Sequence, residues 1–184
     1  MTTDAHRPDA RTRPACALAA LMLLANAAAA QTFMSISPPL GQFQCEETFV
    51  IDVMVDADAI DLHGASFVLE FDDDVIRPLG VTAGARVAGA PCSNFTYWFG
   101  PANADSVAVD VANLGCAVDG PGSIARITFE GYVGGTTTVT LRSCLLRTTA
   151  NAPIPFTFQG AVIHYECAVG DERSTWGTLK SLYR

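Results

Sequence analysis

The sequence has 184 residues, of which 19 are Asp or Glu and 11 are Lys or Arg, so its formal net charge is −8 at neutral pH. An acidic chain without a cluster of basic residues repels phosphate backbones and anionic lipid head groups, so nucleic acid and membrane surfaces are poor candidate partners. The length suffices for one domain with one hydrophobic core, and the sequence contains no internal repeat.

The N-terminal segment, residues 1–30, has the order of regions found in a secretory signal peptide. Three arginines precede an uncharged run rich in Ala, Leu and Met, and small residues end this run just before Gln31. The run is shorter than the roughly 20 apolar residues of a membrane-spanning helix, so we expect cleavage after Ala30. The mature chain would then be secreted, extracellular or held at the cell surface, without membrane insertion after cleavage.

Alternation of apolar and polar residues, the pattern of strands with one buried face, dominates the rest of the chain. It recurs, together with β-branched and aromatic runs, at residues 32–37, 47–56, 65–72, 106–111, 125–130, 136–142, 154–159 and 161–167. Turn residues separate these runs, and no helical periodicity lies between them. Eight or nine short strands in this arrangement predict an all-β sandwich over residues 31–168 and argue against an α/β sheet.

The pattern changes in the C-terminal tail, residues 169–184. Trp176, Leu179 and Leu182 recur there at helical spacing, which is typical of a short amphipathic helix. The tail could act as a sorting or docking tag, or it could fold onto the sandwich or fray, and the sequence leaves these alternatives open.

Five cysteines follow the expected cleavage site: Cys45, Cys92, Cys116, Cys144 and Cys167. In an oxidising compartment they should form disulfides, and the odd count leaves one thiol free or available for an intermolecular bridge. We favour the pair Cys92–Cys116, because both residues lie in turn-rich segments that flank one stretch of predicted strand. Closing this loop would stabilise the fold by about 3–4 kcal/mol. The remaining pairing stays open.

The sequence contains no recognisable catalytic or metal-binding pattern. Asp56, Asp58 and Asp61 invite a calcium interpretation, but the loop's fifth position is apolar and no Gly or distal Glu follows at the required offset, which favours an acidic turn. After residue 30 the histidines are His63 and His164, and neither belongs to a nucleophile-and-base pattern. We therefore expect no enzyme activity, no cofactor and no metal.

An aromatic run at residues 94–99 is the most suggestive local feature. In a strand, Phe95, Tyr97 and Phe99 share one face and Trp98 lies on the other. An exposed aromatic surface could stack on a sugar ring or anchor a protein partner, and Tyr97 and Trp98 are the candidate ligand-stacking residues. The alternative is that core and loops cover both faces of the strand.

Three stretches of the sequence resemble the cohesin family, the sandwich modules of bacterial cellulosome scaffolds. They are the early hairpin at residues 49–53 and 62–76, the Gly-x-Leu-x-x-Ile-x-Phe-like strand at 122–129, and the late hairpin at 136–154. The resemblance covers nearly all of residues 32–167. It implies a nine-stranded jelly-roll sandwich, close in fold to carbohydrate-binding modules, that binds a calcium-loaded dockerin module through one sheet face.

The leading hypothesis from these observations is an exported, non-catalytic, cohesin-like module that recognises a dockerin-type protein through a sheet face. One alternative is a carbohydrate-binding module that holds a polysaccharide on Tyr97 and Trp98. Another is an extracellular structural or adhesive domain. No family contact residue can be assigned to a position in this sequence.

Overall fold

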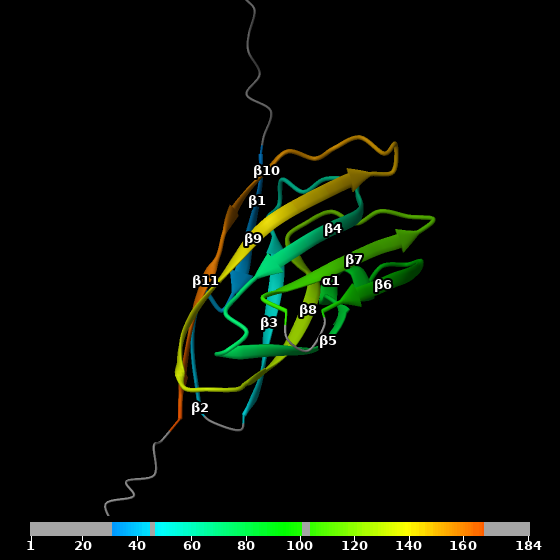
Figure 1. Ribbon diagram of the computed structural model, residues 1–184. Helices are drawn as coiled ribbons and strands as arrows, with labels where there is room; N and C mark the ends of the chain where they lie inside the picture. Colours follow the sequence, from blue (N-terminus) through cyan, green and yellow to red (C-terminus); the bar gives the residue numbers. More distant parts are fainter. Residues whose placement is uncertain (1–30, 45–46, 101–103, 168–184) are drawn as a thin grey trace, which may run out of the picture.

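The computed structural model describes residues 31–44, 47–100 and 104–167. These residues form two facing β-sheets and one short helix (Figure 1). The expected signal peptide (1–30), the C-terminal tail (169–184) and Cys45 lie outside the described residues. Among the described residues, no helix is long and apolar enough to cross a membrane.

The first sheet has five strands, in the order β10 (Phe156–Gln159), β1 (Thr32–Ser37), β3 (Thr48–Val55), β8 (Gly122–Gly131) and β5 (Ile76–Ala83). The second sheet has six, in the order β2 (Leu40–Gln44), β11 (Ala161–Glu166), β9 (Gly135–Thr148), β4 (Leu62–Glu70), β7 (Ser106–Leu114) and β6 (Ser93–Phe99). Neighbouring strands are antiparallel, except that β10 runs parallel to β1 and β2 runs parallel to β11. Helix α1 (Ala85–Ala88) connects β5 to β6.

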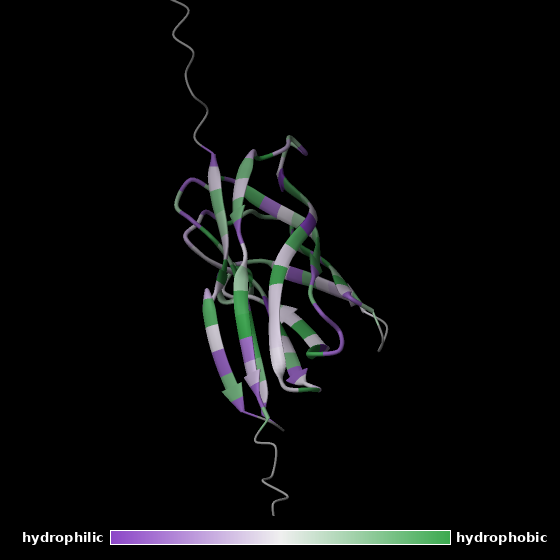
Figure 2. Ribbon diagram, turned by 60° about the vertical axis from the view of Figure 1, so that its left-hand side comes forward, coloured by the Kyte–Doolittle hydropathy of each residue, from purple (hydrophilic) through white to green (hydrophobic). Residues whose placement is uncertain are grey.

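Alternate residues of the central strands fill the space between the sheets. The apolar positions predicted for residues 47–56 are buried, and hydropathy alternates visibly along the ribbons in Figure 2. Phe67 and Leu69 of β4 enter the same core from the opposite sheet. Phe71 and Phe129 meet edge to face, with ring centroids 5.2 Å apart. This two-sided burial confirms the predicted sandwich.

The described residues contain eleven strands, so the expected number of nine is wrong. Strand β2 was missed because Pro38 and Pro39 end the predicted first strand, and the chain crosses there into the second sheet. Strand β5 was missed because Pro78 and Gly80 surround a shift in its register with β8, which interrupts the alternation. Helix α1 has only four residues, too few to show a helical period.

Candidate binding face

The strands β9, β4, β7 and β6 lie side by side and present one side to solvent; we call this solvent-facing side the outer face (Figure 1). The pairing register aligns their outward residues in rows that cross all four strands. One row consists of Phe95, Ala112, Gly64 and Arg147. The next row consists of Tyr97, Asp110, Ser66 and Leu145.

Residue size varies systematically along these rows. Large side chains stand on β6 and β9, whereas Ala112, Gly64 and Ser66 occupy the two strands between them. The result is a shallow hollow of about 280 Å³, with Phe95 on one side and Leu145 on the other. Small residues on the central strands therefore create a concave strip on the outer face.

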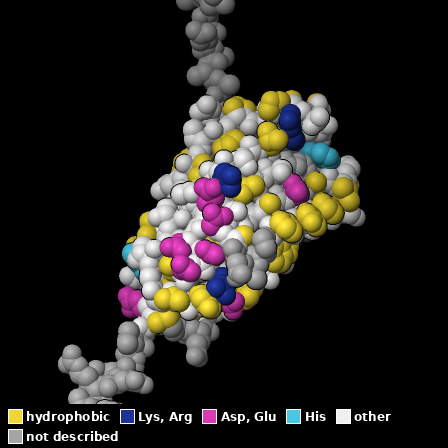
Figure 3. All heavy atoms as spheres, in the orientation of Figure 1, with side chains coloured by type: hydrophobic (Ala, Val, Ile, Leu, Met, Phe, Trp, Pro, Cys, Tyr) yellow, Lys and Arg dark blue, Asp and Glu magenta, His cyan; other side chains and the backbone are white. Residues whose placement is uncertain are grey.

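Exposed aromatic side chains form one side of this hollow. Phe95, Tyr97 and Phe99 expose 50%, 53% and 61% of their surface. Figure 3 shows hydrophobic side chains gathered in a row over β6. Aromatic residues of a monomer are usually buried in its core. A contiguous exposed row of them therefore marks a surface suited to interaction with a partner.

The structure places the two predicted ligand-stacking residues on opposite sides of β6. Tyr97 points to solvent, whereas Trp98 is half-buried and packs against the core. The alternation visible in the sequence already separates them. The sequence reasoning did not identify Leu145 or the small residues of the hollow, because their neighbours on other strands are defined only by the register.

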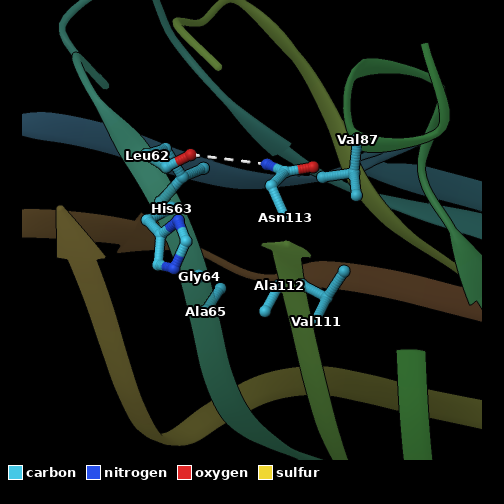
Figure 4. A pocket seen from close by; sticks show the side chains of 8 residues that line it. All are labelled: Leu62, His63, Gly64, Ala65, Val87, Val111, Ala112 and Asn113. Atoms are coloured by element: carbon cyan, nitrogen blue, oxygen red, sulfur yellow. Dashed lines mark hydrogen bonds between the residues drawn. The ribbon is translucent and has the colours of Figure 1, made fainter. Parts of the chain in front are cut away.

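Beneath the outer face, polar contacts fix the ends of β4 and β7. The Asn113 amide nitrogen donates a hydrogen bond to the Leu62 carbonyl oxygen over 3.5 Å, and Figure 4 shows this side chain directed toward Leu62. The His63 Nδ1 lies 2.8 Å from the Cys116 carbonyl oxygen. Since a carbonyl can only accept, the proton of a neutral His63 ring belongs on Nδ1. These contacts hold the strand ends that border the hollow.

A disulfide between Cys92 and Cys116 links the start of β6 to the loop that follows β7. This confirms the pair favoured from the sequence. Cys167 is disulfide-bonded as well. The Cys92–Cys116 bridge ties down the edge strand that carries the aromatic row, so it holds one side of the hollow in position.

Among the described residues, the free thiol is Cys144 on β9. It is half-buried, and its Sγ lies 3.7 Å from the Met34 Sδ across the core. Burial removes the sulfur from water and raises the pKa of the Cys144 thiol from 9.0 to about 12. A thiol held neutral in this way is unreactive, which disfavours the intermolecular bridge that the sequence left open.

The acidic residues that invited a calcium interpretation bind protein groups in turns. Asp58 donates its backbone N–H to Asp56 Oδ1 over 3.1 Å. The Asp61 carboxylate accepts hydrogen bonds from the backbone N–H and the hydroxyl of Thr149, and the Asp61 N–H donates to Asp119. Within the described part of the chain, no group of three His, Cys, Asp or Glu side chains is placed to hold a metal ion. The contacts are those of an acidic turn.

Charged groups on the outer face are few. Asp110 is exposed in the row between Tyr97 and Ser66, and Arg147 ends the row of Phe95, Ala112 and Gly64, where it lines the hollow. The ion pair between Arg142 and Glu70, with 3.4 Å between Nε and Oε1, lies further along β9 and β4. His164 is on β11, outside these four strands, where its Nδ1 lies 2.8 Å from the Thr136 hydroxyl. None of these groups forms a pair of nucleophile and base.

Comparison with solved structures gives consistent results. A non-cellulosomal cohesin from the archaeon Archaeoglobus fulgidus superposes with a TM-score of 0.62 at 12% identity, covering 79% of this chain and 99% of that one. The cohesin in a type I cohesin–dockerin complex from Clostridium thermocellum gives 0.63 at 13% identity, covering 74% and 100%. A type II cohesin domain from the cellulosome of Acetivibrio cellulolyticus gives 0.62 at 13% identity, covering 73% and 95%.

By sequence alone, no family model matches the chain, and no curated protein matches it significantly. The agreement with cohesins therefore lies in the arrangement of the strands. The superposition covers nearly the full length of each cohesin. At these low sequence identities it establishes the fold and assigns no role to individual residues. The chain has a cohesin-like β-sandwich fold.

Proposed function

We propose that this chain is an exported, non-catalytic binding module that recognises a dockerin-type protein partner through its outer face. The single observation that carries this proposal is the row of exposed aromatic side chains beside a hollow of small residues. Several of the solved cohesins with this fold are in complexes with dockerins. An extracellular location agrees with the disulfides, which persist in oxidising compartments.

The dimensions of the outer face suit an α-helix. Strands β6 and β9 are separated by three inter-strand spacings, about 14 Å in total. A helix with its side chains is about 10–12 Å across, so it fits between Phe95 and Leu145 above the small residues. Binding of this kind buries one apolar face of the helix in a groove. The partner would also need a hydrogen-bond donor opposite Asp110, because a carboxylate that loses water without a partner weakens binding.

The proposal is tested by capture of proteins from the source organism's secreted fraction on the immobilised chain, in calcium and in chelator, with mass spectrometry as the readout. The decisive comparison uses Ala112→Arg, which fills the floor of the hollow with a long charged side chain. The matched control is Val50→Arg on β3, an exposed apolar position on the opposite sheet.

We expect the unmodified chain and Val50→Arg to retain the same protein, and Ala112→Arg to lose at least 90% of it. The captured protein should carry duplicated calcium loops, and chelator should release it. Retention by Ala112→Arg at the level of the control would show that the outer face is not the binding site. Capture of polysaccharide alone would replace the protein-binding proposal with the carbohydrate alternative. Mass spectrometry of the exported chain would show whether it starts at Gln31.

A further inference from the structure

We propose that two copies of this chain associate through the free edges of their β6 strands, which pair antiparallel and join the two six-stranded sheets into one. The partner in this contact is a second copy, and the contact uses the backbone edge of the strand. It goes beyond the proposed function, because the outer face of each copy remains open on the joined sheet.

Strand β6 has an unpaired edge. It is the last strand of its sheet, and among the described residues it pairs with β7 alone. Within the described residues, no backbone or side-chain hydrogen bond from another element reaches residues 93–99 on the side away from β7. Five of its seven residues are exposed. An edge of this kind offers a row of N–H and C=O groups that another strand can bind.

The other sheet edges in the described part of the chain carry features that prevent pairing. Strand β5 contains Pro78 and Arg77 and has a register shift. Strand β10 has only four residues, and β2 starts directly after Pro39. By contrast, β6 contains no charged residue, proline or glycine, and it keeps one register with β7 over its full length. Natural proteins protect edges with the devices that β6 lacks.

The sequence of β6 is complementary to itself. When two copies pair antiparallel with Thr96 opposite Thr96, Phe95 of each copy lies opposite Tyr97 of the other. Both of these aromatic pairs lie on the outer face, and each aromatic pair across two strands stabilises the pairing. A two-fold contact requires this kind of self-matching surface.

The charge of the chain, −8, opposes association of two copies over most of their surface. The pairing at β6 avoids this repulsion. On the outer face next to β6, the carboxylate is Asp110 of β7. Two such carboxylates would be separated by at least three inter-strand spacings, about 14 Å. That distance exceeds the Debye length of about 8 Å at physiological ionic strength, so their repulsion is screened.

Sedimentation equilibrium of the purified chain tests the proposal, with a non-reducing gel to show that no intermolecular disulfide forms. Two variants carry opposite charges on the pairing residues: Phe95→Lys/Tyr97→Lys and Phe95→Glu/Tyr97→Glu. In each variant, like charges lie opposite one another across the two-fold axis, at the positions where the unmodified chain would have aromatic pairs. The matched control, Val50→Lys/Leu40→Lys, places two lysines at exposed apolar positions on β3 and β2, away from both the β6 edge and the hollow.

We expect a reversible monomer–dimer equilibrium for the unmodified chain and the control. The dissociation constant should rise about a hundredfold in each charged variant, and an equal mixture of the lysine and glutamate variants should restore the dimer. The proposal is overturned if the unmodified chain stays monomeric up to about 1 mM, or if either charged variant dimerises like the control.

Hydrogen exchange on the unmodified chain at low and high concentration gives a test that does not depend on the folding of any variant. Added protection of amides at residues 93–99 at high concentration supports the pairing. Protection that appears on other strands and leaves these amides unchanged refutes it.

Discussion

The disulfide between Cys92 and Cys116 allows a quantitative prediction for the double variant Cys92→Ser/Cys116→Ser. The two residues are 24 positions apart. On the chain-entropy estimate, a loop of this length stabilises the folded state by about 3.5 kcal/mol at 25 °C, because the crosslink restricts the unfolded chain. For a domain of about 150 residues, such a loss lowers Tm by about 7–14 °C. The disulfide at Cys167 stays intact in this variant and does not offset the loss.

Urea unfolding of the two forms, followed by circular dichroism, measures the difference. We expect a lower free energy of unfolding and a slightly larger m-value, because the unfolded chain without the crosslink exposes more surface. Ser93→Ala, at an exposed position beside the disulfide, is the control and should change stability by less than about 0.5 kcal/mol. A loss below about 1 kcal/mol in the cysteine variant would refute the entropic reasoning and indicate that the unfolded chain is already restricted.

Two further predictions concern the core. Gly131→Ala should destabilise the fold by about 1–3 kcal/mol in urea unfolding, because the new methyl group would overlap the buried ring of Tyr165; a near-neutral result would mean that this ring can move aside. Cys144 should react with iodoacetamide at pH 8 about a thousandfold more slowly in the folded chain than in urea, because its raised pKa keeps it protonated. As the unfolded thiol loses its proton first, the contribution of Cys144 to stability should decline as the pH rises above 9.0.

The sandwich was predictable because its central strands each bury one face. In β3, and in β8 from Ala125 to Phe129, every second residue enters the core, and the printed sequence shows this alternation without any knowledge of pairing. The disulfide was predictable for a related reason. Cys92 lies just before β6 and Cys116 just after β7, and these ends of the two strands are neighbours because the strands pair antiparallel.

Strands at the edges of the sheets were harder to predict. Such strands have fewer neighbours, so their sequences tolerate Pro78 and Gly80 in β5 and a glycine in β2. Both features protect edges from pairing and also remove the pattern by which a strand is recognised. The proline and glycine residues that keep these edges unpaired therefore also make the strands hard to recognise in the sequence.

The hollow on the outer face could not be predicted, because it depends on residues that are adjacent only after the strands have paired. Gly64 and Ala112 are 48 positions apart in the sequence, yet they are direct neighbours in the register of β4 and β7. Leu145 comes from a third strand. Alternation gives the side of each strand that faces solvent, but only the register brings small residues together into a concave strip.

The placement of the aromatic residues on β6 bears on the choice between protein and carbohydrate partners. A sugar-stacking platform with both Tyr97 and Trp98 would need the two rings on one surface, and strand geometry places successive residues on opposite faces. Trp98 packs against the core, so it contributes stability, while the exposed side carries Phe95, Tyr97 and Phe99 in a line. Two of these three rings lack any polar group, and the strip beside them is lined mainly by small residues, with Asp110 and Arg147 as its charged groups. Such a surface offers much apolar area and few hydrogen-bonding groups for sugar hydroxyls, which is the balance expected of a surface that binds the apolar face of a protein helix.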